Sequence, residues 1–358
     1  MKRGDKKGLS TVIVTLILIG LGIVAVVLVW AVIGKTISEG SNEVELGKFT
    51  INLKIEKVII NDGSVEITVK RDVGRGEISG LNIVFFDGAQ QKIVKVNSLD
   101  LGELTTKKFT VDYPGIIKSV GVAPLLKSDS DSVVAGKIQG TIEYSGREAI
   151  ENIPGLVSWW RFEGNAQDEV GDNNGVANGA TQTDGKFGKA YAFDGADDYI
   201  NITNDVSLQL ENSNFTIATW VYLNDYTAVW KSFVTKGNIF NFVDGYGLAT
   251  LNDAPFFGTR YSSAASTNTL SSDNWYHITG THDFNNAGNT IIKIYINGDL
   301  DREEVLASTS STLTNDHLLI GTDENIVWDF NGKIDEFMIF NTTLSEDDIL
   351  ALYNLDLS

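Results

Sequence analysis

The chain has 358 residues, of which 42% are hydrophobic and 10% aromatic, so wholesale disorder is excluded and two or three folded domains are expected. Its formal net charge is −19, and because an acidic surface repels phosphate backbones, we expect no nucleic-acid partner. The absence of cysteine excludes disulfides and thiolate metal sites.

The first predicted element is an apolar helix at residues 9–33. This run has no charged side chain and reaches roughly 37 Å as a helix, more than the ~30 Å hydrocarbon core of a bilayer. A cleaved secretory signal has a shorter apolar core, of about 7–15 residues. Lys2, Arg3, Lys6 and Lys7 precede the run, so the positive-inside rule predicts a cytoplasmic N-terminus. We therefore predict a single-pass protein of the cell membrane, with residues 1–40 as its signal and transmembrane segment and the bulk of the chain extracellular.

The start of this apolar run carries a second signal. Residues 6–10 read KKGLS and lead directly into the uncharged stretch. This junction resembles the class III signal of archaeal type IV pilins and archaellins. The resemblance implies cleavage between Gly8 and Leu9 and self-assembly of the helix into a filament core. Bacterial type IV pilins usually have Glu at the fifth mature position, where this chain has Ile13. A plain membrane anchor with basic flanks remains the alternative.

Residues 41–150 read as a small β-sandwich. Short runs of alternating polarity recur about every ten residues, separated by turn sequences such as Asn61-Asp62-Gly63 and Asp87-Gly88. The predicted strands lie at residues 49–58, 65–70, 81–86, 93–96, 109–111, 116–122 and 137–144. This pattern favours an immunoglobulin-like sandwich that acts as a stalk, because no catalytic or metal-binding motif accompanies it. Residues 147–154 are expected to form the linker to the next domain.

Residues 151–358 contain a series of motifs whose order is informative. They are LVSWWRFE (156–163), DEVGDNNG (168–175), KFGKAYAFDG (186–195), FTIATWV (215–221), WYHI (275–278), IYING (294–298) and GKIDEFMIFN (332–341). These motifs resemble the laminin-G-like family, the concanavalin A-like lectin/glucanase jelly rolls. The resemblance covers about 200 residues and implies a jelly-roll β-sandwich. The fold class is therefore mainly β, with two sandwiches behind one helix.

Residue patterns support this architecture. Phe215, Ile217 and Val221 alternate with Ala218 and Trp220, so this strand is expected to be covered on both faces. Near the C-terminus, Ser345 precedes three acidic residues, which is typical of the N-cap and first turn of a helix.

The family resemblance also implies a structural calcium ion. Ca²⁺ takes six to eight oxygen ligands, and Asp, Asn and backbone carbonyls supply them. The implied site joins the acidic loop after the first strand to the closing strand. Its candidate ligands are Glu163, Asp168, Asp172, Asn173, Asn174 and Asp335. The alternative is that these residues only shape turns.

Carbohydrate binding is the predicted function of the C-terminal domain. Sugar rings stack their apolar faces on aromatic side chains, while polar groups bind the hydroxyls. The candidates are aromatic residues in polar, loop-like surroundings: Tyr226, Trp230, Phe256, Phe257, Tyr261 and Trp328. The alternative for each is a place in the core, as expected for Trp159, Trp160, Phe193, Trp220, Trp275 and Phe340.

The chain is not expected to be an enzyme. Glycosidases of this fold pair two carboxylates on one strand face, about 5 Å apart for retention. Asp335 and Glu336 are adjacent, so strict alternation would point them to opposite faces. No HExxH, GxSxG or P-loop motif is present.

Together these observations predict a membrane-anchored or pilin-like surface protein that binds a glycan or a surface protein. The alternatives are a structural subunit of an archaeal pilus or cell envelope that has no specific ligand, and, less favoured, an anchored polysaccharide hydrolase.

Overall fold

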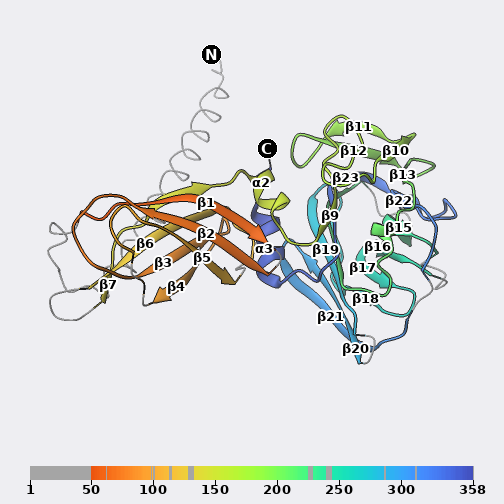
Figure 1. Ribbon diagram of the computed structural model, residues 1–358. Coiled ribbons are helices and arrows are strands. Elements are labelled where there is room, and N and C mark those ends of the chain that lie inside the picture. Colours follow the sequence, from red (N-terminus) through yellow and green to blue (C-terminus); the bar gives the residue numbers. More distant parts are fainter. Residues whose placement is uncertain are drawn as a thin grey trace, which may run out of the picture.

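The computed structural model describes residues 50–357, except for 62, 98, 100, 113–114, 128–132, 225–228, 239–243, 286–287 and 311–312. The predicted helix at residues 9–33, the signal motif around Gly8 and the candidate ligand residue Tyr226 lie outside the described residues. Within the described part of the chain, no helix has the length and apolar character needed to cross a membrane. Two β-sandwiches lie side by side, with two short helices between them (Figure 1).

The N-terminal sandwich is built from eight strands: β1 (Leu53–Asn61), β2 (Ser64–Arg71), β3 (Ile78–Phe86), β4 (Gln91–Asn97), β5 (Thr106–Asp112), β6 (Ser119–Lys127), β7 (Val133–Ala135) and β8 (Gln139–Glu143). One sheet has the order β1-β2-β5 and the other the order β4-β3-β6-β7, with β8 also paired to β6. Val65, Ile67 and Val69 alternate along β2 and are fully buried in the shared core, as period-two patterning predicts. A β-sandwich in this region is thus confirmed.

The C-terminal sandwich consists of two larger antiparallel sheets. The seven-stranded sheet has the order β10 (Gly175–Asn178), β13 (Tyr199–Ile202), β22 (Leu318–Ile320), β15 (Trp230–Lys236), β16 (Tyr246–Leu251), β17 (Ala254–Thr259) and β18 (Ser263–Ala265). The eight-stranded sheet has the order β11 (Thr181–Asp184), β12 (Lys189–Asp194), β23 (Asn331–Phe340), β14 (Phe215–Leu223), β19 (Trp275–Asp283), β20 (Asn289–Ile296) and β21 (Asp299–Ala307), with β9 (Leu156–Trp160) paired to β23. This arrangement is consistent with the predicted jelly roll.

Strand β14 is covered on both faces, as its sequence predicted. Phe215, Ile217 and Val221 point into the core between the two sheets. Ala218 belongs to a second apolar cluster on the outer face of the eight-stranded sheet, and on that face Trp220 packs against Tyr353 with ring centroids 5.6 Å apart.

That outer face is covered by helix α3 (Glu346–Asn354), which buries Ile349, Ala351 and Leu352. The predicted N-cap is confirmed, because the Ser345 side chain accepts the backbone N–H of Asp348 and the Asp348 side chain accepts that of Ser345 in return.

The two sandwiches meet at the same helix. Ile116 of the N-terminal sandwich belongs to the apolar cluster around α3, and its backbone N–H donates to Asp348 Oδ1 at 2.9 Å. Helix α2 (Gly146–Glu151) contributes Ala149 and Ile150 to that cluster. The expected boundary at residue 150 therefore falls inside α2, a helix that packs with the C-terminal domain.

A β-bulge in β23 changes one expectation from the sequence. The register between β14 and β23 shifts between Ala218 and Trp220, and Glu336 has a φ of 50°. Asp335 accepts from the loop that packs on Trp220, and Glu336 accepts from Trp159, so both carboxyl groups lie on the helix-covered face. The expectation of opposite faces was wrong because the bulge breaks the period-two alternation.

Candidate ligand-binding site

Three of the six predicted ligand-binding aromatics come together on the outer face of the seven-stranded sheet. The ring centroids of Trp230 and Trp328 lie 6.1 Å apart at an interplanar angle of 47°. Phe256 meets Trp230 edge-on, with centroids 5.1 Å apart and an angle of 88°. We refer to Trp230, Phe256 and Trp328 as the aromatic cluster. Because its rings are mutually inclined, the cluster forms a corner rather than a flat platform.

The strand pattern explains why this cluster forms. Along β17, Phe257 is fully buried in the core, so its neighbour Phe256 lies on the opposite, outer face. The register places Ala249 of β16 and Ala265 of β18 on either side of Phe256. Both alanines pack with the cluster, and their small side chains leave room beside Phe256 for the larger indole rings.

Trp328 comes from loop 322–329, which connects β22 to β23 and is organised by one carboxylate. Asp323 is 3% exposed, and its Oδ1 accepts the backbone N–H groups of Val327 at 2.7 Å and Trp328 at 3.0 Å. Its Oδ2 accepts the N–H of Asn325 at 3.2 Å. Bonds from backbone N–H groups to a buried carboxylate are strong, so Asp323 fixes the path of the loop as far as Trp328.

The same loop is fastened to β15. The hydroxyls of Ser232 and Thr235 donate to the carbonyl of Thr322 at 2.8 and 3.0 Å. At the other end, the backbone N–H of Ser232 donates to the carbonyl of Trp328 at 2.9 Å. Both ends of loop 322–329 are therefore held on the sheet.

Aliphatic side chains extend the cluster to the surface. Val229 is 59% exposed, Ile326 45% and Val327 64%. Ile326 also has a φ of 51°, a conformation that is costly for a β-branched residue.

The charges near the cluster are mainly negative. Lys231 is buried and ion-paired with Asp253, with Nζ 2.6 Å from Oδ1. Partial desolvation raises the pKa of Glu324, whose side chain stays exposed, and so do the nearby charges of Asp316 and Asp244. Burial also raises the pKa of Asp329; its bond from Thr322 opposes the rise, and the charges of Asp323, Asp194 and Asp197 add to it.

Phe257 and Tyr261 do not join this cluster. Phe257 lies in the same strand as Phe256, rather than in the expected loop, and it is a core residue in contact with Phe215, with ring centroids 5.6 Å apart. Tyr261 is 43% exposed and stacks with Arg260, whose Cζ lies 4.5 Å from the ring centroid.

Sequence reasoning missed Val229, Ile326, Val327 and Asp323. The only hint in the sequence was two aliphatic residues beside a tryptophan in a polar stretch.

The first group of predicted calcium ligands makes hydrogen bonds within its own loop and to neighbouring segments. Asp168 accepts the backbone N–H groups of Trp159, Val170 and Asn173 at 2.9–3.2 Å. Asn174 accepts the N–H of Asp168, and the Asn173 amide donates to the hydroxyls of Ser158 and Ser207. Asp172 is exposed.

The second group is engaged elsewhere. Asp335 is fully buried and accepts the backbone N–H groups of Lys186, Phe187 and Glu336, at 2.8–3.0 Å. Glu163 accepts the N–H of Lys189 at 2.9 Å. Burial raises the pKa of Asp335 to about 7 despite those three donors. Each of the two carboxylates, Asp168 and Asp335, therefore accepts three backbone N–H groups, which use three of its about four lone-pair sites.

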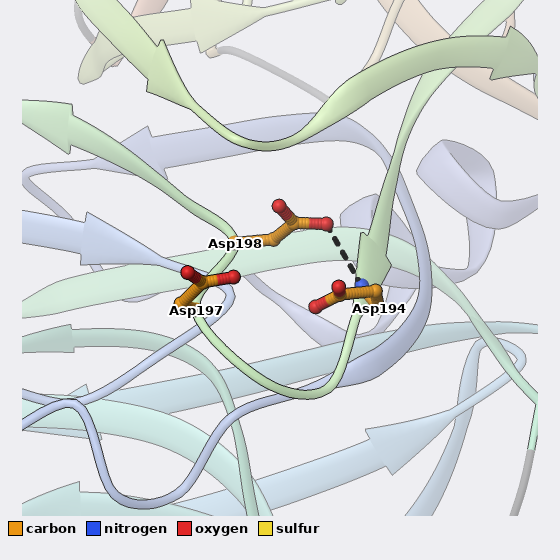
Figure 2. Close-up of side chains that lie close together, drawn as sticks. All are labelled: Asp194, Asp197 and Asp198. Carbon is orange, nitrogen blue, oxygen red and sulfur yellow. Dashed lines mark hydrogen bonds between the residues drawn. The ribbon is translucent and has the colours of Figure 1, made fainter.

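A different acidic group lies within reach of one cation. Among the Asp, Glu and His residues that the structure describes, the one group of three or more with ligand atoms within 4.8 Å of one another is Asp194, Asp197 and Asp198 (Figure 2). These residues form the turn between β12 and β13. Two of their oxygens already accept backbone N–H groups, those of Asp194 and Ala196. The turn is therefore held together by its own hydrogen bonds.

The buried acids of β23 are not arranged like a glycosidase pair. Glu336 Oε2 accepts the indole N–H of Trp159 at 2.6 Å, and its Oε1 lies 3.6 Å from Arg161 Nε. Burial, followed by the charge of Asp335, raises the pKa of Glu336 to about 8. Asp335 and Glu336 are both 0% exposed, so a sugar does not reach them in this conformation.

Comparison with known proteins agrees with this fold. Residues 194–350 match the model of the concanavalin A-like lectin/glucanases superfamily (Laminin_G_3), so the predicted laminin-G-like jelly roll is confirmed for this region. Strands β9 and β12 pair with β23 and extend the same domain toward residue 156. A comparison with curated proteins gave no match.

Several solved structures resemble a little over half of the chain. Domain 4 of AbnA, a GH43 extracellular arabinanase from Geobacillus stearothermophilus solved with arabinotriose, is 18% identical, with a TM-score of 0.44 over 55% of this chain and 98% of that one. The binding domain of Paraclostridial Mosquitocidal Protein 1 is 20% identical, with a TM-score of 0.46 over 56% of this chain and 52% of that one. The botulinum neurotoxin serotype D binding domain is 19% identical, with a TM-score of 0.44 over 56% and 51%. The chain thus spans about half the length of the two toxin structures.

Proposed function

We propose that the chain is a membrane-anchored or pilin-like cell-surface protein whose C-terminal jelly roll binds an extracellular carbohydrate. The observation that carries this proposal is the aromatic cluster of Trp230, Phe256 and Trp328 beside exposed aliphatic side chains. Aromatic rings take the apolar face of a sugar, and a preformed loop reduces the entropy lost on binding. The match of residues 194–350 to a lectin-containing superfamily supports a ligand-binding role.

The position of the cluster also supports the proposal. The seven-stranded sheet lies on the side of the molecule away from the N-terminal sandwich (Figure 1). If residues 9–33 anchor the chain, the N-terminal sandwich, of immunoglobulin-like type, holds the cluster away from the membrane as a stalk would. A glycan or a glycosylated surface protein is then the partner.

The anchor itself rests on the sequence of residues 9–33 and on the basic residues before it. N-terminal sequencing of the native protein distinguishes its two forms. A start at Leu9 supports cleavage after Gly8 and a filament subunit, whereas retention of Met1 supports a plain anchor. Recovery of the entire native chain in the aqueous fraction would contradict both forms.

Calcium binding stays a prediction from the family resemblance. No step of the proposed recognition requires it, because the aromatic cluster and Asp323 are organised by side-chain packing and hydrogen bonds. We likewise propose no enzymatic role, since the paired acids of β23 are buried under their own hydrogen-bond partners.

A glycan-array screen of the full-length protein tests the proposal. We expect binding to a subset of glycans, and binding at least roughly tenfold weaker for Trp328→Ala. Tyr261→Ala is the matched control, because Tyr261 is an exposed aromatic outside the cluster, and it should bind as wild type does. Absence of all glycan binding, or equal losses in both variants, would contradict the proposal. An EDTA arm tests calcium separately: loss of binding there would make the ion part of the site.

A further inference from the structure

We infer that this site selects uncharged carbohydrates over acidic ones. We also infer that Asp323 is a positioning residue, which holds loop 322–329 and thereby fixes Trp328. Both inferences rest on the proposed function of the aromatic cluster. Two observations lead to them: the sign of the charges around the cluster and the way in which loop 322–329 is held.

Loop 322–329 contains three carboxylates and no basic residue. Asp323 is buried beneath the loop, Glu324 is exposed, and Asp329 is half-buried. Asp194 and Asp197 act on Asp329 from the neighbouring turn between β12 and β13. An anionic ligand at Trp328 would therefore approach several like charges, and it would have to leave water to do so.

The basic residues of β15 do not offset these charges. Lys231 is 1% exposed at its side chain and is paired with Asp253 at 2.6 Å. Lys236 is 0% exposed, donates to the Thr314 carbonyl at 2.8 Å and lies 4.0 Å from Glu211. Each ammonium is buried and faces an acid of the protein, so neither is placed to bind a uronate or a sulfate.

A neutral sugar suits the same surroundings. Its hydroxyls donate hydrogen bonds, and the exposed side chains of Glu324 and Asn325 offer oxygen acceptors next to Trp328. Its apolar face fits the inclined rings of Trp230 and Trp328 together with the exposed Val327. The groups that repel an anion are thus acceptors for an uncharged polyol.

Asp323 acts on the ligand only through the loop. Its carboxylate holds the N–H groups of Asn325, Val327 and Trp328, and the turn that it closes carries Ile326 at a positive φ. Replacing one carboxylate oxygen by an amide turns an acceptor into a donor that faces backbone N–H groups. Trp328 would then lose its fixed position while the strands beneath stay paired.

The test uses matched tetrasaccharides, each as the neutral hexose and as its uronic acid, in the mannose, glucose and galactose series. Binding to the full-length protein is measured by calorimetry at low ionic strength. We expect at least one neutral tetrasaccharide to bind roughly tenfold or more tightly than its acidic counterpart. The double variant Glu324→Gln/Asp329→Asn should reduce that ratio several-fold. Asp347→Asn, which removes an exposed charge on α3, should leave it unchanged.

Asp323→Asn is measured alongside, with circular dichroism as the check on folding. We expect neutral binding to weaken roughly tenfold, with the thermal unfolding of the sandwich retained. Equal binding of neutral and acidic members, or a ratio unaffected by Glu324→Gln/Asp329→Asn, would overturn the inference and leave carbohydrate binding standing. Wild-type affinity in Asp323→Asn would overturn the positioning role. Failure of every tetrasaccharide to bind would count against the proposed function itself.

Discussion

The two outer faces of the C-terminal sandwich both carry tryptophans, and their comparison shows what separates structural from functional aromatics. On the eight-stranded sheet, Trp159 is 0% exposed and Trp220 4% exposed, under α3 and the domain junction. On the seven-stranded sheet, Trp230 and Trp328 are half-buried beside exposed Val327. The residue type is the same, and what differs is the exposed fraction of the ring, which is close to zero under α3 and larger on the seven-stranded sheet.

The hydrogen bonds of the two faces also differ in what they hold in place. On the covered face, the Trp159 indole N–H donates to Oε2 of the buried Glu336 carboxyl group. On the other face, Asp323 satisfies backbone N–H groups and so presents Trp328 at the surface. The first face uses its hydrogen bonds to close a core, and the second uses them to hold a loop ready for a ligand.

The largest expected effect follows from truncating a tryptophan on the covered face. Trp159→Ala removes a fully buried ring and leaves Glu336 without its donor, so we expect a loss of about 3–5 kcal/mol in the free energy of unfolding. Urea denaturation of the full-length protein measures it. Trp328→Ala should cost no more than about 1.5 kcal/mol. Similar losses in both variants would remove the distinction between the faces.

A pH titration sharpens the comparison at His277, which lies on the covered face with its ring 5.2 Å from Trp220. Burial, with a smaller effect of Lys186, lowers the pKa of His277 from 6.5 to about 3. As the pH falls, His277 therefore takes up its proton in the unfolded state before it does so in the folded state. Its contribution to the free energy of unfolding is fully present above about pH 6.5 and is lost as the pH falls toward about 3. The loss from this group is about 1.4 kcal/mol per pH unit in that window.

His277→Phe should remove this contribution, so that its unfolding free energy falls less steeply with acid than that of the wild type. His317→Gln, at an exposed histidine, is the control and should follow the wild-type curve. Parallel curves for wild type and His277→Phe would mean that the ring is already accessible to water.

A smaller effect is expected at the junction between the sandwiches. Asp348 completes the capping box of α3 and accepts the N–H of Ile116, so Asp348→Ala should cost about 1–2 kcal/mol. Asp347→Ala, at the neighbouring exposed position, should change stability by less than about 0.5 kcal/mol. Thermal denaturation compares the two variants, and an equal response would show that the cap does not join the domains.

The smallest effect on stability is expected at Val327. Its side chain is 64% exposed, so Val327→Ser should change the free energy of unfolding by less than about 0.5 kcal/mol. Because Val327 extends the aromatic cluster, glycan binding should weaken roughly threefold. Val305→Ser is the matched control at an exposed valine on β21, and it should leave binding unchanged. An unaltered affinity for Val327→Ser would confine the site to the aromatic rings.

Much of the fold could be predicted because period-two patterns and caps are local signals. The covered strand at Phe215 and the N-cap at Ser345 both follow from residues next to them in the sequence. The position of Glu336 could not be predicted, because a bulge in β23 is decided by its pairing with β14. Adjacent phenylalanines posed a similar difficulty: alternation puts Phe256 and Phe257 on opposite faces but does not say which one is inside.

The candidate site could be predicted only in part, because some of its features are local in the sequence and others depend on how distant segments fold together. Aromatic residues in polar surroundings pointed to Trp230 and Trp328, although they are far apart in the sequence. The role of Asp323 depends on where its loop folds, and nothing in the sequence separates it from Asp168, which also accepts three backbone N–H groups but ties its loop to Trp159 of β9. Acidic residues in Gly- and Asn-rich loops serve both purposes, so residue type alone did not assign them.

Hydrogen–deuterium exchange of the full-length protein, with and without a glycan that it binds, tests the central claim most directly. If the outer face of the seven-stranded sheet is the binding face, added glycan will slow exchange in residues 229–236 and in loop 322–329, and exchange in α3 will stay the same. Protection confined to α3, β9 or the junction with the N-terminal sandwich would place recognition on the other face and contradict the account.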